Sequence, residues 1–261
     1  MLSTTICGQS DFVAKEFSSF KTSDYTDKKF LEKYKEKVSF HSNLFLPFLD
    51  KVFGEVKEKK LLDVGCGDGS LSKHFANLGA QVIGVDNSRQ WIDSCKKDYA
   101  GVKGLEFKLA DATDLSAFPD ASFDFVLLSM VLIHMDSPEK VQKTIFECER
   151  VLKSDGVFAF SDLHPVLVMT KEVYPRYQRY EKDFSYLRDG SNFIAGLWLS
   201  KKKRIEFKDK HWTPQFYFKC LKNAGLFVDE IAELAYGKES PKEFQKIKIP
   251  DYLFFVCKKR K

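Results

Sequence analysis

The sequence predicts an α/β fold built on a mostly parallel sheet, and three observations carry that prediction. Apolar runs typical of buried strands alternate with amphipathic segments typical of helices. A turn with glycines at alternate positions, Gly65, Gly67 and Gly69, joins the first of these strands to its helix. The chain has 261 residues, of which 44% are hydrophobic, and this suits one such domain with an insertion or a small cap.

The strands are expected where apolar runs end in turns. The run at residues 123–129 is nearly continuous, as expected for a parallel strand that is buried on both faces. The last two strands are separated by a polar loop, residues 237–246, that is too short and too poorly periodic for a crossover helix, so we expect an antiparallel hairpin. In chain order, the expected strands cover residues 60–64, 81–86, 105–110, 123–129, 157–161, 226–234 and 252–257.

Helices are expected between the strands, and their first residues indicate where they begin. Ser88 is a good N-cap for the helix after the second strand. Ser137 at the cap and Pro138 at the first position begin a helix that continues to residue 152. The segment Ser154-Asp155-Gly156 is then expected to turn the chain into the fifth strand. Apolar spacing predicts two further helices, at residues 70–78 and 214–223.

The N-terminal part of the chain differs from the rest. Residues 1–22 are polar and mixed, and we expect them to be poorly ordered. Apolar residues at threes and fours predict one or two amphipathic helices within residues 24–53. We therefore divide the chain into an N-terminal helical lid segment, residues 1–55, and a main domain, residues 56–261, with an aromatic-rich insertion at about 164–212.

Composition narrows the class of protein. No apolar run approaches the roughly 18 residues of a membrane span, and the N-terminus lacks the basic-then-apolar order of a signal peptide. The six cysteines are scattered without a C-x-x-C pair, which argues against a disulfide framework or a zinc site and favours a cytoplasmic setting. The net charge of +5 comes with short lysine clusters, which are more typical of solvated loops than of a nucleic-acid surface. We expect a monomer or a homodimer.

The glycine turn indicates a nucleotide-like ligand at the carboxyl end of the first strand. Its spacing is G-x-G-x-G rather than the G-x-G-x-x-G of dinucleotide-binding folds, and no Gly-Lys-Ser/Thr follows as in a P-loop. The stretch of residues 61–70 instead resembles the first motif of the Rossmann-like, class I S-adenosylmethionine-dependent methyltransferases. That resemblance implies a seven-stranded sheet with helices on both faces and S-adenosyl-L-methionine as the cofactor, with S-adenosyl-L-homocysteine as the product.

Two acidic residues extend the resemblance. Asp86 ends the second strand 21 residues after Gly65, where an acidic side chain accepts from the ribose hydroxyls. Its structural alternative is a helix cap. Asp111 resembles the acidic residue that accepts from the adenine amine, beside the amide of Ala112, and its alternative is a turn aspartate. The cofactor-binding residues that the resemblance implies are Asp63, Gly65, Cys66, Gly67, Asp86, Asn87, Asp111, Ala112 and Ser129.

Two further segments, residues 118–124 and 149–156, closely resemble one branch of the class, the small-molecule methyltransferases similar to the ubiquinone and menaquinone enzymes. The matched segments lie within residues 60–162. The chain departs from the branch at Ser154-Asp155, where Pro-Gly is usual, and this affects only a surface turn. The resemblance implies transfer of a methyl group to the O, N or C atom of a small aromatic or amphipathic metabolite.

Histidines near strand ends are the candidate catalytic groups, because removing a proton from a hydroxyl or an ammonium acceptor requires a base. They are His134, which alternatively packs beside the cofactor, His164 and His211. The insertion between the last two is rich in aromatic residues, and it forms either a substrate lid or a cap that packs on its own rings. The candidate substrate-binding residues are Tyr25, Tyr34, Tyr174, Tyr177 and Trp198. No His-x-x-x-His or carboxylate cluster suggests a metal.

The sequence disfavours two other functions. An RNA methyltransferase, such as one acting on tRNA, is disfavoured because the residues after the fourth strand, Ser129-Met130-Val131-Leu132, lack the Asn/Asp-Pro-Pro-aromatic stretch that grips a flipped base. A non-catalytic cofactor-binding protein is disfavoured because the glycine turn, Asp86 and Asp111 are intact.

Overall fold

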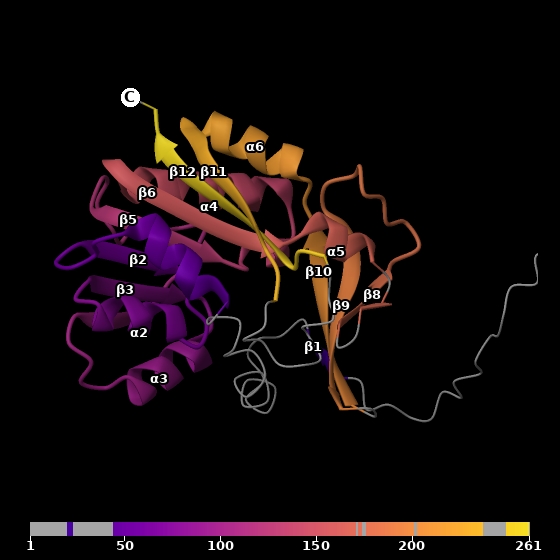
Figure 1. Ribbon diagram of the computed structural model, residues 1–261, viewed down its shortest axis with the longest axis horizontal. Coiled ribbons are helices and arrows are strands. Elements are labelled where there is room, and N and C mark those ends of the chain that lie inside the picture. The colour runs from indigo at the N-terminus through magenta and orange to yellow at the C-terminus, as the bar shows by residue number, and fades with distance from the viewer. Residues whose placement is uncertain are drawn as a thin grey trace, which may run out of the picture.

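The computed structural model describes residues 20–22, 44–170, 172–173, 176–200, 203–236 and 249–260. Three of the candidate substrate-binding residues, Tyr25, Tyr34 and Tyr174, lie outside these ranges, and so does the polar loop expected at residues 237–246. The described chain forms two sheets that stand side by side (Figure 1). No helix in the described ranges is both long enough and apolar enough to cross a membrane.

The larger sheet confirms the predicted fold class. Within the described residues it has seven strands in the order β11-β12-β6-β5-β2-β3-β4. The five strands from β6 to β4 are parallel, whereas β12 is antiparallel to both β6 and β11 and forms the expected hairpin with β11. The strands are β2 (Lys60–Val64), β3 (Gln81–Asp86), β4 (Leu105–Leu109), β5 (Phe123–Ser129), β6 (Leu152–Leu163), β11 (Leu226–Leu234) and β12 (Tyr252–Lys259).

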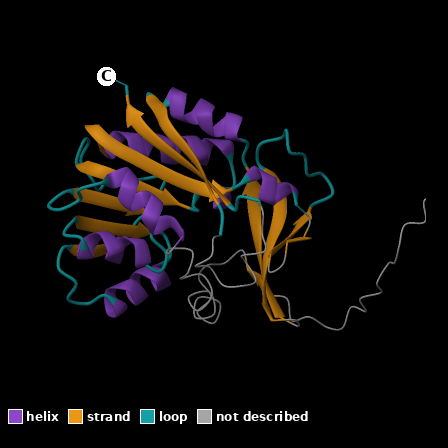
Figure 2. Cartoon of the chain, in the orientation of Figure 1, coloured by secondary structure: helices purple, strands orange, loops and turns teal. Residues whose placement is uncertain are grey.

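Helices cover both faces of this sheet (Figure 2). Side chains of α4 and α6 pack with Leu62 and Val64 on one face, whereas α2 and the helix of residues 44–53 pack with Leu61 on the other. This alternation follows from the two-residue period of a strand, which sends successive side chains to opposite faces. The helices of this sheet that are labelled in Figure 1 are α2 (Ser70–Asn77), α3 (Arg89–Asp98), α4 (Pro138–Val151) and α6 (Pro214–Asn223).

The predicted helix caps are confirmed where local chemistry determines them. The Ser88 hydroxyl accepts from the backbone amide of Trp91 at 3.4 Å and caps α3. The Ser137 hydroxyl accepts from the amide of Lys140 at 3.3 Å, and Pro138 occupies the first turn of α4. These bonds satisfy amides that the helix itself leaves unpaired.

Strand β6 begins earlier than predicted, at Leu152 instead of residue 157. The expected turn at residues 154–156 is part of one continuous strand, in which Leu152 pairs with Phe123 and Val157 with Phe125. The intervening residues bulge out of register. An added Cβ at Gly156 would lie 2.9 Å from the carbonyl oxygen of Asp124, so only glycine allows the two strands to approach here.

The insertion, at about residues 164–212, forms most of the second sheet. In the described residues this sheet has the order β1-β10-β9-β8-β7, and β7 to β10 form successive antiparallel pairs. Residues 20–22, which were expected to be poorly ordered, add a strand parallel to β10. The elements are β1 (Phe20–Thr22), α5 (Pro165–Met169), β7 (Glu172–Val173), β8 (Arg176–Tyr180), β9 (Ser191–Ser200) and β10 (Lys203–His211).

Figure 1 shows how the two sheets are placed relative to each other. Strand β6 runs directly into α5 and the second sheet, so the carboxyl ends of the parallel strands face the insertion. This edge is where open α/β sheets bind their ligands.

Candidate functional site

The glycine turn after β2 is held against the end of β3. The amides of Gly65 and Cys66 both donate to the carbonyl of Val85, at 2.7 and 2.9 Å. The amide of Gly67 donates to Oδ2 of Asp86 at 3.0 Å. Gly67 has a φ of 52°, and a Cβ added there would meet no atom within 4 Å. The turn therefore leaves open space beside Gly67, where a side chain would otherwise project.

Gly65 brings a second loop close to the turn. A Cβ at Gly65 would lie 2.3 Å from Cγ2 of Val131, which caps the short 3-10 helix η1 (Leu132–His134) after β5. Gly65 also has a φ of 71°, in the left-handed region. This glycine thus lets η1 pack directly on the turn.

Asp86 ties the turn to α3. Its Oδ1 accepts from the amide of Ser88 at 2.8 Å, and its Oδ2 accepts from Gly67. The N-cap of α3 is Ser88. Asp86 therefore does not cap this helix, which was the structural alternative to its cofactor role. Burial raises the pKa of Asp86, and its two backbone hydrogen bonds oppose that rise. A carboxylate has about four lone-pair sites, so accepting two amides leaves capacity for a further donor. Asn87 is exposed beside it.

Asp63 lies beneath the turn and is almost fully buried. The Ser72 hydroxyl of α2 donates to its Oδ2 at 2.5 Å. Burial raises the pKa of Asp63 to about 7, against the lowering effect of this hydrogen bond. Asp63 therefore links β2 to α2 from inside the protein.

Asp111 follows β4 at the same edge of the sheet. Its Oδ1 accepts from both the amide and the hydroxyl of Thr113, each at 2.8 Å. Asp111 thus stabilises a turn, which was the alternative to its cofactor role. The side chain of Asp111 is exposed, and Ala112 packs against the core.

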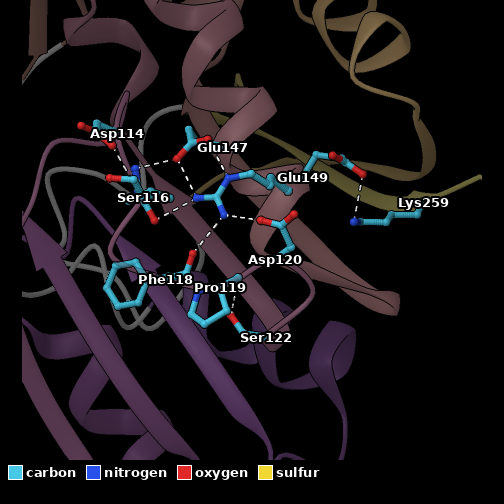
Figure 3. A network of polar contacts seen from close by, with 11 residues as sticks. Asp114, Ser116, Phe118, Pro119, Asp120, Ser122, Glu147, Glu149 and Lys259 are labelled. Carbon is cyan, nitrogen blue, oxygen red and sulfur yellow. Dashed lines mark hydrogen bonds and ion pairs between the residues drawn. The ribbon is translucent and has the colours of Figure 1, made fainter.

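The loop after Asp111 is held by Arg150 of α4 (Figure 3). Its guanidinium donates to the carbonyls of Leu115 and Phe118, each at 2.9 Å, and to the carboxylate of Asp120 at 2.7 Å. It also forms two 2.8 Å bonds to Glu147, whose Oε2 accepts from the amide of Leu115 at 2.7 Å. The side chain of Arg150 is 27% exposed. This network links the two segments that resemble one branch of the methyltransferase class, residues 118–124 and 149–156. Arg150 lies in the second segment and contacts the first.

Replacing Arg150 with alanine should lower the free energy of unfolding by about 2–4 kcal/mol, because several charge-assisted hydrogen bonds are lost together. Chemical denaturation measures this, and calorimetry should show weaker cofactor binding if the loop of Asp111 shifts. Lysine should not restore the stability, since an ammonium cannot reproduce the planar fork.

The matched control for Arg150 is Glu149→Gln on the same helix. Glu149 forms a single 2.9 Å ion pair with Lys259, so we expect a loss of about 1 kcal/mol or less (Figure 3). Equal losses in the two variants would show that the network adds nothing beyond one ion pair.

His134 faces both the turn and the insertion. Its Nδ1 lies 3.1 Å from Oδ1 of Asp209, a residue of β10 whose side chain is 5% exposed. The His134 side chain is 32% exposed, and its partial burial lowers the pKa of the ring. Contact with Asp209 and the charges of Asp162 and Asp86 outweigh this effect, so the net shift of the His134 pKa is upward. The hydroxyl of Ser129, at the end of β5, lies 3.1 Å from that of Ser161 on β6. Of the three candidate histidines, His134 is the one placed beside the glycine turn.

The other two histidines are held by structural contacts. Nδ1 of His164 accepts from the amide of Val166 at 3.1 Å, and its Nε2 lies 2.9 Å from a carboxylate oxygen of Glu233. Both ring nitrogens are therefore engaged. Nε2 of His211 donates to the carbonyl of Tyr186 at 2.9 Å, and burial lowers the pKa of this nearly fully buried ring.

The aromatic side chains described in the insertion pack mainly on one another. Phe184 stacks on Tyr180 and packs edge-on against Phe193, with centroids 4.5 and 6.4 Å apart. The Tyr180 hydroxyl donates to the carbonyl of Val168 at 2.6 Å. Of the candidate substrate-binding residues, Tyr177 lies in β8 and Trp198 in β9, and only their backbone is described. In the described part of the chain, no group of three His, Cys, Asp or Glu side chains is placed to hold a metal ion.

Sequence reasoning missed two residues, Arg150 and Asp209. Arg150 lies inside a matched motif, and the loop ends that it joins are about 30 positions away, so a covarying pair could have indicated it. Asp209 has no local signal, because it is one of several charged residues in the strand Lys203–His211.

The known proteins that this chain resembles are methyltransferases, as the glycine turn and the sheet order indicate. A family model described as a methyltransferase domain matches residues 62–160. The ubiquinone biosynthesis O-methyltransferase of Nitrosomonas europaea is 31% identical over 195 residues, which are 74% of this chain and 74% of that protein. The enzyme of the same name from Thiobacillus denitrificans is 35% identical over 107 residues, 41% of this chain, and the match spans only 45% of that relative.

Solved structures share the fold at lower identity. An S-adenosylmethionine-dependent methyltransferase from Mesorhizobium loti has a TM-score of 0.63 and 21% identity, with 82% of this chain and 97% of that chain covered. One from Clostridium acetobutylicum has a TM-score of 0.61 and 15% identity, with 89% and 98% covered.

The sheet order, the glycine turn and these relatives define the class: the chain belongs to the Rossmann-like S-adenosylmethionine-dependent methyltransferases. Within that class it resembles the ubiquinone-type branch. S-adenosyl-L-methionine is accordingly its cofactor. The residues present fit this molecule, because the space beside Gly67 is open and the Asp86 carboxylate borders the turn.

Proposed function

We propose that this protein transfers a methyl group from S-adenosyl-L-methionine to a hydroxyl oxygen of a small aromatic metabolite. The observation that carries the proposal is the meeting of the glycine turn and His134 at one edge of the sheet, where Gly65 admits η1 beside the turn. Support for an oxygen acceptor comes from the relatives, which are named O-methyltransferases. A nitrogen or carbon acceptor is the alternative.

The turn and the two acidic residues are proposed to hold the cofactor. Asp86 would accept from the ribose hydroxyls, since its carboxylate borders the turn through Gly67. Asp111 would accept from the adenine amine, beside the amide of Ala112. Asp63 would act from beneath, by fixing β2 against α2. Ser129 would contribute backbone groups at the end of β5.

His134 is the proposed base. When bound, the cofactor supplies a methyl group on a positively charged sulfur, which is already a good leaving group. Nδ1 of His134 lies 3.1 Å from Oδ1 of Asp209. In the neutral tautomer that keeps its hydrogen on Nδ1, the lone pair is on Nε2, and this nitrogen would accept the proton of the hydroxyl. With that proton removed, the hydroxyl oxygen would be the nucleophile toward the methyl group that the cofactor supplies. The protein otherwise holds the acceptor in line, which is a large part of the catalytic effect.

We propose that the insertion and residues 1–55 cover the acceptor as a lid. Support comes from β1, which pairs residues 20–22 with β10 and so joins the N-terminal segment to the insertion. We also propose a reducing, cytoplasmic setting, supported by the five free cysteines of the described chain.

The test is a transfer assay with methyl-labelled cofactor and an acceptor panel: catechol, a prenylated catechol, a primary arylamine and bulk tRNA. We expect label in the catechols as a methyl ether, identified by mass spectrometry. Transfer to tRNA alone would overturn the small-molecule proposal, and transfer to the arylamine alone would overturn the oxygen acceptor. Cofactor binding by calorimetry without any transfer would favour the non-catalytic alternative.

A further inference from the structure

The short helix η1, which carries the proposed base, is anchored by the insertion at each of its three residues. The indole of Trp212, directly after β10, donates to the carbonyl of Leu132 at 2.8 Å. Ile133 packs in an apolar cluster with Phe193 of β9. His134 contacts Asp209 of β10 at 3.1 Å.

The opposite side of the same loop rests on the cofactor turn. Val131 fills the space that a side chain at Gly65 would need. The loop after β5 is therefore packed between the turn that binds the cofactor and the second sheet. The insertion is thus part of the wall that fixes the reacting edge, in addition to any role as a cover.

We propose that Asp209 is a positioning residue for the transfer reaction: from the insertion, its carboxylate lies 3.1 Å from Nδ1 of His134 and so holds the ring at the edge of the sheet where the acceptor would bind. The proposal rests on His134 as the base of the proposed function. An aspartate that orients a histidine in this way also stabilises the imidazolium that forms when the ring takes a proton. Asp209 is 4% exposed, so its charge is poorly screened by water.

Other charged groups also act on His134. Asp162, at the end of β6, is held by the hydroxyl of Tyr217 on α6, at 2.5 Å, and burial raises its pKa to about 7. Asp86 contributes from the end of β3. Asp209 differs from both because it contacts the ring itself, and its substitution therefore isolates the effect of the insertion.

The first measurement is a titration of the histidine ring protons by NMR on the full chain with cofactor bound, which requires no acceptor. The resonance of His134 is assigned by its loss in His134→Gln. We expect Asp209→Asn to lower the titration midpoint of His134 by about one pH unit, because an adjacent negative charge favours the imidazolium. Asp209→Glu retains the charge and should keep the midpoint high, and it also serves if the asparagine variant fails to fold.

The second measurement is the pH profile of transfer to the acceptor that the panel identifies. Because the base must be neutral, the rate should rise with pH through the pKa of His134, and in Asp209→Asn this rise should move to lower pH. At the plateau, kcat should fall by about 10- to 100-fold, less than the loss on removing the base. KM for the cofactor should stay within about twofold.

The matched control is Asp183→Asn, which removes a carboxylate from the same insertion. Asp183 is exposed and pairs with Arg188 at 3.1 Å, and we expect normal kinetics and an unchanged midpoint. In a double-mutant cycle, Asp209→Asn should cost nothing further in a His134→Gln background.

Different outcomes would overturn the role of Asp209 and the role of His134 as the base. An unchanged His134 midpoint in Asp209→Asn, or an equal loss of kcat with and without His134, would overturn the role of Asp209 alone. A normal rate in His134→Gln would overturn the base role and with it the catalytic consequence of Asp209.

Discussion

Replacing Gly67 with valine should abolish binding of S-adenosyl-L-methionine, with affinity falling by at least about 10³-fold, or about 4 kcal/mol. The Cβ position at Gly67 opens onto space that no protein atom approaches within 4 Å. A branched side chain would therefore fill the space in which we propose that the cofactor meets the turn. The backbone of Gly67 has a φ of 52°, so valine also strains the chain, by about 1–3 kcal/mol. Calorimetry measures the affinity and thermal unfolding measures the strain.

Gly101 provides the matched control for this substitution. It has a φ of 83°, nothing lies within 4 Å of its Cβ position, and it lies in the connection between α3 and β4. Gly101→Val should therefore show a similar fall in Tm with unchanged affinity. If the two variants lose affinity equally, the effect passes through global stability, and if Gly67→Val binds normally, the turn is not the cofactor site.

Features determined by neighbouring residues could be predicted from the sequence. Ser88 and Ser137 cap their helices as expected, because a hydroxyl needs only the next few amides. The strands at residues 81–86 and 123–129 have the bounds that their apolar runs indicated. The glycine turn and Asp86 meet as the motif implied, since adjacent parallel strands end at the same edge.

Features that depend on distant partners could not be predicted. The bulge at the start of β6 exists because Gly156 approaches the backbone of Asp124 on another strand. β1 forms on a partner strand more than 180 residues away, and nothing in three residues of sequence indicates that pairing. Asp209 could not be predicted either, because its proposed role depends on its contact with His134, which is 75 positions away in the sequence. The class of protein follows from local motifs, whereas the proposed wall of its acceptor site depends on contacts between the insertion and the loop after β5.

Replacing Asp86 with alanine should weaken cofactor binding by on the order of 10²- to 10⁴-fold. Two hydrogen bonds from ribose hydroxyls to a carboxylate are worth about 1.5–3 kcal/mol each, and every 1.4 kcal/mol is about tenfold in affinity. The chain should still fold. Because burial raises the pKa of Asp86, its ionised form does not stabilise the native state at neutral pH. The amide of Gly67, which loses its acceptor, borders open space and can be hydrated. The amide of Ser88 also loses its acceptor, and because Ser88 is 2% exposed we expect this to cost about 1–3 kcal/mol of stability.

Asp124→Ala is the matched control for Asp86→Ala, because it also removes a partly buried aspartate from the larger sheet. Asp124 lies near the start of β5, at the opposite edge, where it accepts from the amide of Lys60 at 2.9 Å and pairs with Lys153 at 2.8 Å. This variant should lose stability and keep the cofactor affinity within about twofold. If Asp86→Ala also stays within twofold, the carboxylate only supports the turn and the ribose assignment is wrong.

The pH dependence of binding provides an independent check on Asp86. In the proposed role its ionised form would accept from the ribose hydroxyls, so affinity should fall as pH decreases through the pKa of Asp86. Because burial raises that pKa, the fall should occur at a higher pH than the ordinary aspartate value of about 3.9. In Asp86→Asn, which cannot ionise, affinity should be low at all pH values and this limb should disappear. Calorimetric titrations at several pH values, each with a check that the protein remains folded, measure both profiles. A limb that persists unchanged in Asp86→Asn would assign the titration to another carboxyl group, of which Asp63 beneath the turn, with a pKa of about 7, is the nearest candidate.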